Sequence, residues 1–202
     1  MNKFNEQEFL EICKKLKTQP YSEDITITYE RDSYFNKLKH AVSYDRRGEV
    51  VFCVIRPNGK IITVTCSEYP EGIYRIPTGG IGHHEDIVAA ANRETYEELG
   101  LQADIVKFAG VLKIKFENTS NSVMFYSYIF IMKETGGNLL KDATDDEVSE
   151  VKEVDIEELF QIADKLNNIN GKWHDWGRFR YVTTNAVARY LKEHQNEILG
   201  NY

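Results

Sequence analysis

Three glutamates stand close together in the segment RETYEELGL: Glu94, Glu97 and Glu98. Residues three and four positions apart on a helix have Cβ atoms about 5 to 6 Å apart, so on a helix these carboxylates share one side. Like charges at this spacing destabilise a helix, whereas a hard divalent cation with oxygen ligands stabilises them. Magnesium is commonly shared between one or two carboxylates and the phosphates of a substrate. The spacing therefore predicts a site for magnesium or manganese (Mg²⁺ or Mn²⁺) that faces a diphosphate.

A short helix must present these carboxylates, and its neighbours indicate where it begins and ends. Glu85 and Asp86 are expected in its first turn, where negative charge suits the helix dipole. Gly100 is expected to end it as a left-handed cap. An apolar stripe at helical spacing predicts the face that packs on a sheet, and its members are Val88, Ala91, Thr95 and Leu99. Taken alone, ETYEELG would fit a solvated acidic face equally well.

Three glycines lie just before this helix, at Gly79, Gly80 and Gly82. Without side chains they allow backbone carbonyls or amides to approach a metal ion or a phosphate closely. We therefore expect this segment to form part of the same site as the glutamates.

The longer pattern from Gly79 to Leu101 matches GX5EX7REUXEEXGU, where U is a bulky aliphatic residue. In this pattern the chain resembles the Nudix hydrolase family. Thr95 is the one departure, and because it is β-branched and close to valine in size it can still pack inward. The resemblance implies an α+β fold of the Nudix-like α/β/α sandwich type, with a mixed β-sheet. It also implies metal-dependent hydrolysis of a diphosphate bond in a nucleoside diphosphate linked to another group.

The resemblance also implies roles for particular residues. Glu94, Glu97, Glu98 and the carbonyl of Gly79 are expected to bind the metal, with Glu94 and Glu98 also counted as catalytic. Arg93 is expected to orient Glu85 and the metal-binding carboxylates through salt bridges, and Gly80 to support the site.

The general base is expected from a later loop, in the acidic run KDATDDEVSEV. Its candidates are Asp145, Asp146, Glu147 and Glu150, and Glu147 is preferred as the third catalytic residue. Each of these residues alone could equally be part of a solvated acidic loop.

Substrate contacts are expected just before the signature, on a strand predicted over residues 72–76. Tyr74 could stack on a ligand and Arg75 could bind its phosphates, although cross-strand packing explains both equally well. His83 and His84 could touch phosphate or remain exposed in a loop. Some Nudix subfamilies carry a proline or tyrosine at a set distance after the signature, but the chain has no proline after Pro77. A preference for ADP-ribose or for dinucleoside polyphosphates therefore gains no support from the sequence.

Alternating elements surround the signature. An Asn-Gly pair at Asn58 and Gly59 joins two β-rich segments, residues 50–55 and 61–65, and predicts a hairpin. Further strands are predicted at 105–115 and 122–132, with helices near 9–16, 155–166 and 184–199. We expect a hydrolase domain over residues 40–166, an N-terminal helical extension over 1–39, and a C-terminal aromatic and helical extension over 167–202.

Composition excludes several classes of protein. The chain has 202 residues, is 42% hydrophobic and carries a formal charge of −7, so it can bury a core and is a poor electrostatic match for nucleic acid. Its apolar runs are too short to cross a bilayer, and its start has no apolar signal core, so a soluble cytoplasmic protein with no membrane partner is expected. Three cysteines without metal-site spacing are expected to be buried, reduced thiols.

Two alternatives remain at the level of sequence. The first helix and the aromatic segment GKWHDWGRFRY could pack on the domain, form a homodimer contact, or cover the substrate. The protein could also be a non-catalytic Nudix-like module that binds a nucleotide, although such modules normally lose signature carboxylates.

Overall fold

Strand β2 (Arg46–Ile55) runs through the interior of a mixed sheet and supplies two separate cores. Residues 50–55 alternate between these cores, and none of them is more than 1% exposed. A continuous apolar run of this kind can be buried on both faces only in an interior strand that helices cover from both sides.

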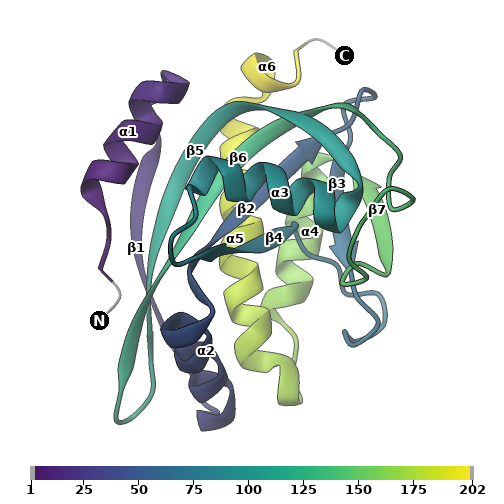
Figure 1. Ribbon diagram of the computed structural model, residues 1–202. Coiled ribbons are helices and arrows are strands. Elements are labelled where there is room, and N and C mark those ends of the chain that lie inside the picture. Colours follow the sequence, from purple (N-terminus) through teal and green to yellow (C-terminus); the bar gives the residue numbers. More distant parts are fainter. Residues whose placement is uncertain (1–2, 201–202) are drawn as a thin grey trace.

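The computed structural model describes residues 3–200, and its sheet has the order β1-β5-β6-β2-β3-β7, with β4 also paired to β2 (Figure 1). Strand β1 is parallel to β5 and β6 is parallel to β2, while the other pairs are antiparallel. The mixed sheet of the predicted α+β fold is thereby confirmed. The remaining strands are β1 (Tyr21–Thr28), β3 (Ile61–Thr65), β4 (Thr78–Gly82), β5 (Leu101–Glu117), β6 (Ser122–Gly137) and β7 (Glu150–Val154).

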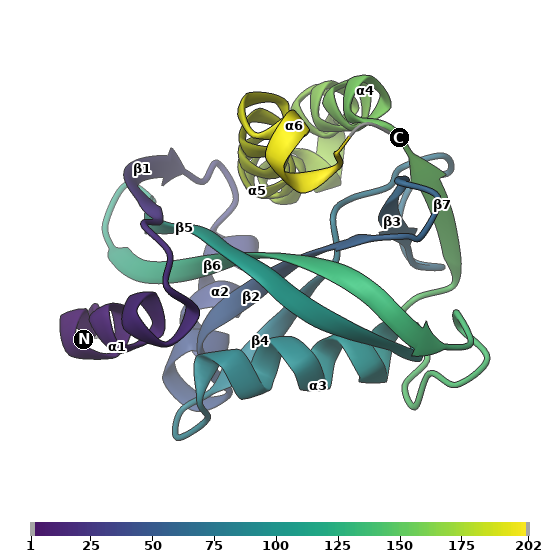
Figure 2. The same ribbon diagram turned by 90° about the horizontal axis from the view of Figure 1, so that it is seen from above.

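Helices cover both faces of the sheet, as Figure 2 shows from above. Helix α3 (Ile87–Leu99) lies against one face, and α1 (Glu6–Leu16) contributes Ile12 to the same core. Helices α4 (Ile156–Asn167) and α5 (His174–Glu193) pack together on the opposite face. Helix α2 (Asp32–Tyr44) and the short α6 (Gln195–Ile198) also contribute to that second core.

Helix α3 has the predicted inward stripe and the predicted end. Thr95 is 1% exposed, and its hydroxyl donates to the carbonyl of Ala91 at 2.7 Å, so the departure from an aliphatic residue leaves no unpaired polar group in the core. Gly100 ends the helix at φ 68°, in the left-handed region. The predicted first turn is wrong: Asp86 is the N-cap, accepting from the amide of Ala89, and Glu85 lies outside the helix.

The predicted hairpin is confirmed by β2 and β3, which pair antiparallel. The strand predicted over residues 72–76 is wrong, because only Arg75 forms an isolated bridge there, to Val64. The strand instead lies at β4, within the glycine-rich segment, where it pairs with β2. Glycine is disfavoured in strands, so β-propensity did not predict a strand at β4, which forms because it pairs with β2.

The first 44 residues contain more than the predicted helix. They supply the edge strand β1, which pairs in parallel with β5 in the main sheet, so a purely helical extension over 1–39 is wrong. Helix α2 and the short edge strand β7 were also missed.

The C-terminal helix begins ten residues earlier than predicted, at His174. Its aromatic part packs inward, because the ring centroid of Phe179 lies 4.9 Å from that of Phe116 and 5.8 Å from that of Phe125.

All three cysteines are free thiols, but only Cys53 is fully buried. Cys13 and Cys66 are half-buried, so the expectation of three buried thiols is corrected. Within residues 3–200, no helix is both long and apolar enough to cross a membrane.

Candidate active site

Strand β4 brings the backbone of the glycine segment against helix α3. Gly79 pairs with Val50 of the central strand, and a Cβ atom on Gly79 would lie 2.1 Å from both Cγ and Cδ of Glu94. Contacts this short are not tolerated, so only glycine allows the Glu94 side chain to lie across this strand. The Gly79 and Glu94 of the predicted site are therefore in direct contact.

Arg93 ties the strand and the helix together. Its Nε and Nη2 donate to the two carboxylate oxygens of Glu85, at 2.7 and 3.0 Å, and Nη2 also donates to the carbonyl of Gly80 at 2.9 Å. Its Nη1 donates to Glu94 at 2.8 Å and to Glu97 at 2.7 Å. This is the orienting arrangement expected for Arg93, with Glu85 and Gly80 as its supports.

Glu85 is held from a second direction. Its carboxylate accepts from the amide of Gly82 at 3.0 Å, and its own carbonyl accepts from Nη2 of Arg47 at 2.7 Å. Arg47 also forms a two-pronged ion pair with Glu8 of α1, at 2.7 and 2.8 Å. The hydrogen bonds from Arg93 lower the pKa of the Glu85 carboxyl, so it stays ionised as an anchor.

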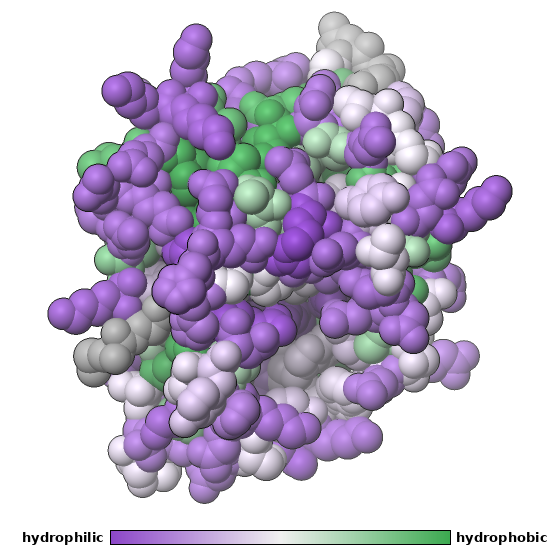
Figure 3. Space-filling model, viewed as in Figure 1, coloured by the Kyte–Doolittle hydropathy of each residue, from purple (hydrophilic) through white to green (hydrophobic). Residues whose placement is uncertain are grey.

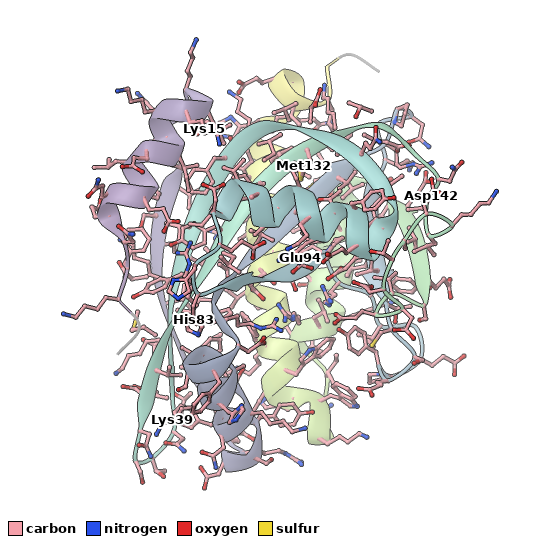
Figure 4. All side chains as sticks on the ribbon, viewed as in Figure 1. Lys15, Lys39, His83, Glu94, Met132 and Asp142 are labelled. Carbon is pink, nitrogen blue, oxygen red and sulfur yellow. The ribbon has the colours of Figure 1, made fainter. Side chains whose placement is uncertain are left out.

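A polar cavity of about 250 Å³ lies where β4, α3 and the acidic loop meet. Figure 3 shows hydrophilic side chains along α3 with a hollow below them, and Figure 4 shows Glu94 on the side of α3 nearest to it. Glu97 does not line the cavity but is directed to Arg93. The residues that line it are Asp45, Arg46, Thr78, Gly79, Gly80, Gly82, Glu85, Arg93, Glu94, Glu98 and Glu147.

Glu98 is the most unusual group in this cavity. It is 2% exposed, and its Oε2 atom is buried without a hydrogen-bond partner. Burial raises the pKa of the Glu98 carboxyl to about 8, against the opposing charge of Arg75 and with smaller contributions from Glu94 and Glu147. Burial likewise raises the pKa of Glu94, although Arg93 opposes it. A buried, unpaired carboxylate such as that of Glu98 is costly, so this side chain is suited to bind a cation.

The donor chemistry fits a magnesium or manganese ion. The cavity offers carboxylate oxygens of Glu94 and Glu98 and the backbone of Gly79, and hard divalent cations prefer oxygen ligands. Within residues 3–200, no three acidic, histidine or cysteine side chains are already grouped as a metal site. Arg93 instead forms ion pairs with Glu85, Glu94 and Glu97.

We expect the metal-free protein to lose stability as the pH rises from about 5 to 8. The native state keeps a proton on Glu98 at pH values where the unfolded chain has released it, so unfolding releases a proton and stability falls with rising pH. The expected loss is on the order of 2 kcal/mol. Urea unfolding in chelator at several pH values measures it, with Glu98→Gln as the control that should show a much flatter dependence. An equal dependence of stability on pH in the two proteins would contradict the assignment of this proton to Glu98.

The acidic loop meets the cavity only in part. Glu147 lines it and acts electrostatically on both Glu94 and Glu98, which is the placement expected of the preferred base candidate. Asp146 instead lines a neighbouring cavity, and Glu150 accepts a hydrogen bond from the hydroxyl of Tyr74 at 2.6 Å. Asp145 is near enough to influence the pKa of Glu98 but does not line the cavity.

The predicted substrate contacts are only partly in place. Tyr74 lines neither cavity, so the structure does not bring it to the site, and its hydroxyl instead donates to Glu150. Arg75 is 7% exposed, lines the neighbouring cavity and donates to Ile76, Thr78 and Tyr69. His83 lies apart from the glutamates, beside Lys39 in a separate cavity.

Sequence reasoning missed Asp45 and Arg46, which line the main cavity and form an ion pair at 2.7 Å. It also missed Tyr69. The run YDRRGE carries the charges of Asp45 and Arg46, but its position opposite the signature depends on the pairing of β2 with β4.

Comparison with known proteins identifies the family of this chain. A family model described as NUDIX domain matches residues 45–177, well over half of the chain. The chain belongs to the Nudix family. Of the signature residues of this Nudix domain, Gly79, Glu85, Arg93, Glu94 and Glu98 line the cavity, whereas Glu97 and Gly100 do not.

Individual relatives are more distant. Diphosphoinositol polyphosphate phosphohydrolase 2 of Rattus norvegicus is 28% identical over 109 residues, or 54% of this chain, and the match spans about half, 52%, of that relative's length. A solved UDP-X diphosphatase covers 95% of this chain and 73% of its own at 13% identity, with a TM-score of 0.48. A C. elegans Ap4A hydrolase binary complex covers 72% of this chain and 98% of its own at 17% identity, with a TM-score of 0.47.

Proposed function

We propose that this Nudix protein hydrolyses a diphosphate bond in a nucleoside diphosphate linked to a second group, with Mg²⁺ or Mn²⁺ as cofactor. The observation that carries the proposal is the buried Oε2 of Glu98, which has no hydrogen-bond partner and lies in a cavity with Glu94 and Gly79. A carboxylate in this setting favours a cation, and a magnesium ion bound by few protein ligands keeps positions for phosphate and water.

Each residue of the cavity has a separate role in the proposed hydrolysis. Glu94, Glu98 and the Gly79 carbonyl would hold the ion, with Glu97 as a further ligand once it leaves Arg93. The bound ion would neutralise diphosphate charge and make a water easier to deprotonate. Glu147, which lines the cavity from the acidic loop, would accept the proton of the attacking water. Arg93 would keep Glu94 and the Gly80 backbone in register.

A panel of nucleoside diphosphate derivatives tests this function. With Mg²⁺ or Mn²⁺, purified protein should release a monophosphate from at least one member, and excess chelator should return release to background. A diphosphoinositol polyphosphate, the compound class in the name of the rat relative, is assayed beside the nucleotide panel. Glu157→Gln, on the exposed surface of α4, is the matched control for Glu98→Gln and should not alter release.

Two outcomes would contradict the proposal. Release that persists in excess chelator would remove the metal-dependent mechanism. Metal-dependent binding of a panel member, measured by calorimetry, without any release would instead favour the alternative of a non-catalytic nucleotide-binding module.

A further inference from the structure

A second cavity, of about 350 Å³, adjoins the first. Glu147 lines both, so the two cavities share a wall. A substrate whose diphosphate occupies the first cavity can therefore extend its attached group into the second. The residues that line the second cavity are Cys66, Ser67, Glu68, Tyr69, Arg75, Asp146 and Glu147.

The inner wall of this cavity is fixed in place. The Nε of Arg75 donates to the hydroxyl of Tyr69 at 3.0 Å, and its Nη1 donates to Ile76 and Thr78. On its other side, Tyr69 packs against Trp173 and Trp176 at ring-centroid distances of 5.8 and 4.5 Å. A wall that is already ordered before a ligand arrives lowers the entropic cost of binding.

The charges around the two cavities are mostly negative. Three arginines line them, Arg46, Arg75 and Arg93, and no lysine or histidine does so among residues 3–200. All three already have partners. Arg46 forms an ion pair with Asp45, and Arg93 forms an ion pair with Glu85. Arg75 donates hydrogen bonds to the neutral hydroxyl oxygens of Tyr69 and Thr78. In the second cavity the carboxylates of Glu68, Asp146 and Glu147 outnumber the one arginine, Arg75.

We propose that the second cavity receives the group beyond the diphosphate and selects an uncharged, hydroxyl-bearing group over one with further phosphates. Glu68 and Asp146 would accept hydrogen bonds from hydroxyl groups, and Tyr69 provides an aromatic surface for a sugar ring. A further phosphate would meet these carboxylates with no free cation to offset the repulsion. This inference rests on the proposed function.

The ratio of kcat/KM for ADP-ribose to that for ATP tests the inference, because both substrates carry the same nucleoside diphosphate. ADP-ribose adds a neutral sugar and ATP adds a phosphate. The wild-type ratio should exceed one. Glu68→Lys should shift the ratio toward ATP by about three- to tenfold, since it replaces repulsion by attraction at a distance of several ångströms.

Glu71→Lys is the matched control. It makes the same charge change in the same exposed loop, but Glu71 lines neither cavity, so the ratio should stay within about twofold of the wild-type ratio. A wild-type preference for ATP, or equal shifts in the two variants, would overturn the inference. Absence of any metal-dependent release would instead count against the proposed function, so the two failures are distinguishable.

Cys66 gives a readout that does not depend on turnover. It lines the second cavity and is half-buried, as is Cys13 on α1, which lies elsewhere. A non-hydrolysable α,β-methylene analogue of ADP-ribose should slow alkylation of Cys66 by iodoacetamide and leave Cys13 unaffected. Equal alkylation of Cys66 with and without saturating analogue would overturn the inference.

Discussion

Glu98→Gln should lower kcat by about 10³-fold or more, which corresponds to about 4 kcal/mol of lost transition-state stabilisation. The amide has nearly the same shape as the carboxylate, so the packing of this buried side chain is kept. What is lost is the negative charge with which we propose that Oε2 binds the cation in the cavity. Steady-state kinetics with a substrate identified from the panel measures the effect.

A second measurement separates this explanation from misfolding. Because Glu98 is a buried carboxyl whose pKa is raised, the glutamine variant should be at least as stable as the wild type in chelator at pH 8. Its affinity for Mn²⁺ should fall by at least tenfold in a titration. Full activity in Glu98→Gln, or normal Mn²⁺ affinity, would exclude Glu98 as a ligand.

Arg93→Lys should lower kcat/KM by about 100-fold and reduce the free energy of unfolding by about 2 kcal/mol. The guanidinium makes five hydrogen bonds, to Glu85, Glu94, Glu97 and the Gly80 carbonyl. An ammonium group has the same charge but cannot reach these partners together. Glu94 would then lose its orientation over Gly79. Steady-state kinetics and urea unfolding measure the two effects.

Arg56→Lys is the matched control for this change. Arg56 also pairs with two glutamates, Glu134 and Glu153, but lines neither cavity. It should cost some stability and leave kcat/KM within about twofold, because this half-buried ion pair does not line the cavities. If Arg93→Lys changed kcat/KM no more than Arg56→Lys does, the orienting role would be excluded.

Local spacing made part of the site predictable. Glu94 and Glu98 lie on the buried side of α3 because their spacing from Val88, Ala91 and Leu99 determines where they point on any helix. Gly100 was predictable for the same kind of reason, since a left-handed cap needs glycine. The direction of Arg93 toward Glu85 followed from the resemblance to the Nudix family.

What could not be predicted depends on partners distant in sequence. Strand β4 exists because Gly79 and Gly80 pair with β2, against the propensity of glycine. Glu97 shares the spacing of its neighbours, but Arg93 competes for its carboxylate and turns it away from the cavity. Tyr69 reaches the site only because two tryptophans about a hundred residues later pack against it. Helix α2 carried a usable signal that was overlooked, with Phe35, Leu38 and Val42 at helical spacing.

The pairing of β4 with β2 has a consequence for how this enzyme family can diversify. The backbone of Gly79 and Gly80, which we propose faces the diphosphate, is paired with the central strand β2, so it can shift only if the middle of the sheet shifts. The second cavity is bordered largely by exposed connecting segments that include Glu68 and Asp146. Such segments tolerate substitution better than the strands and helices that they connect. Mutation of the segments around the second cavity can therefore change the substrate preference while the residues of the first cavity stay the same.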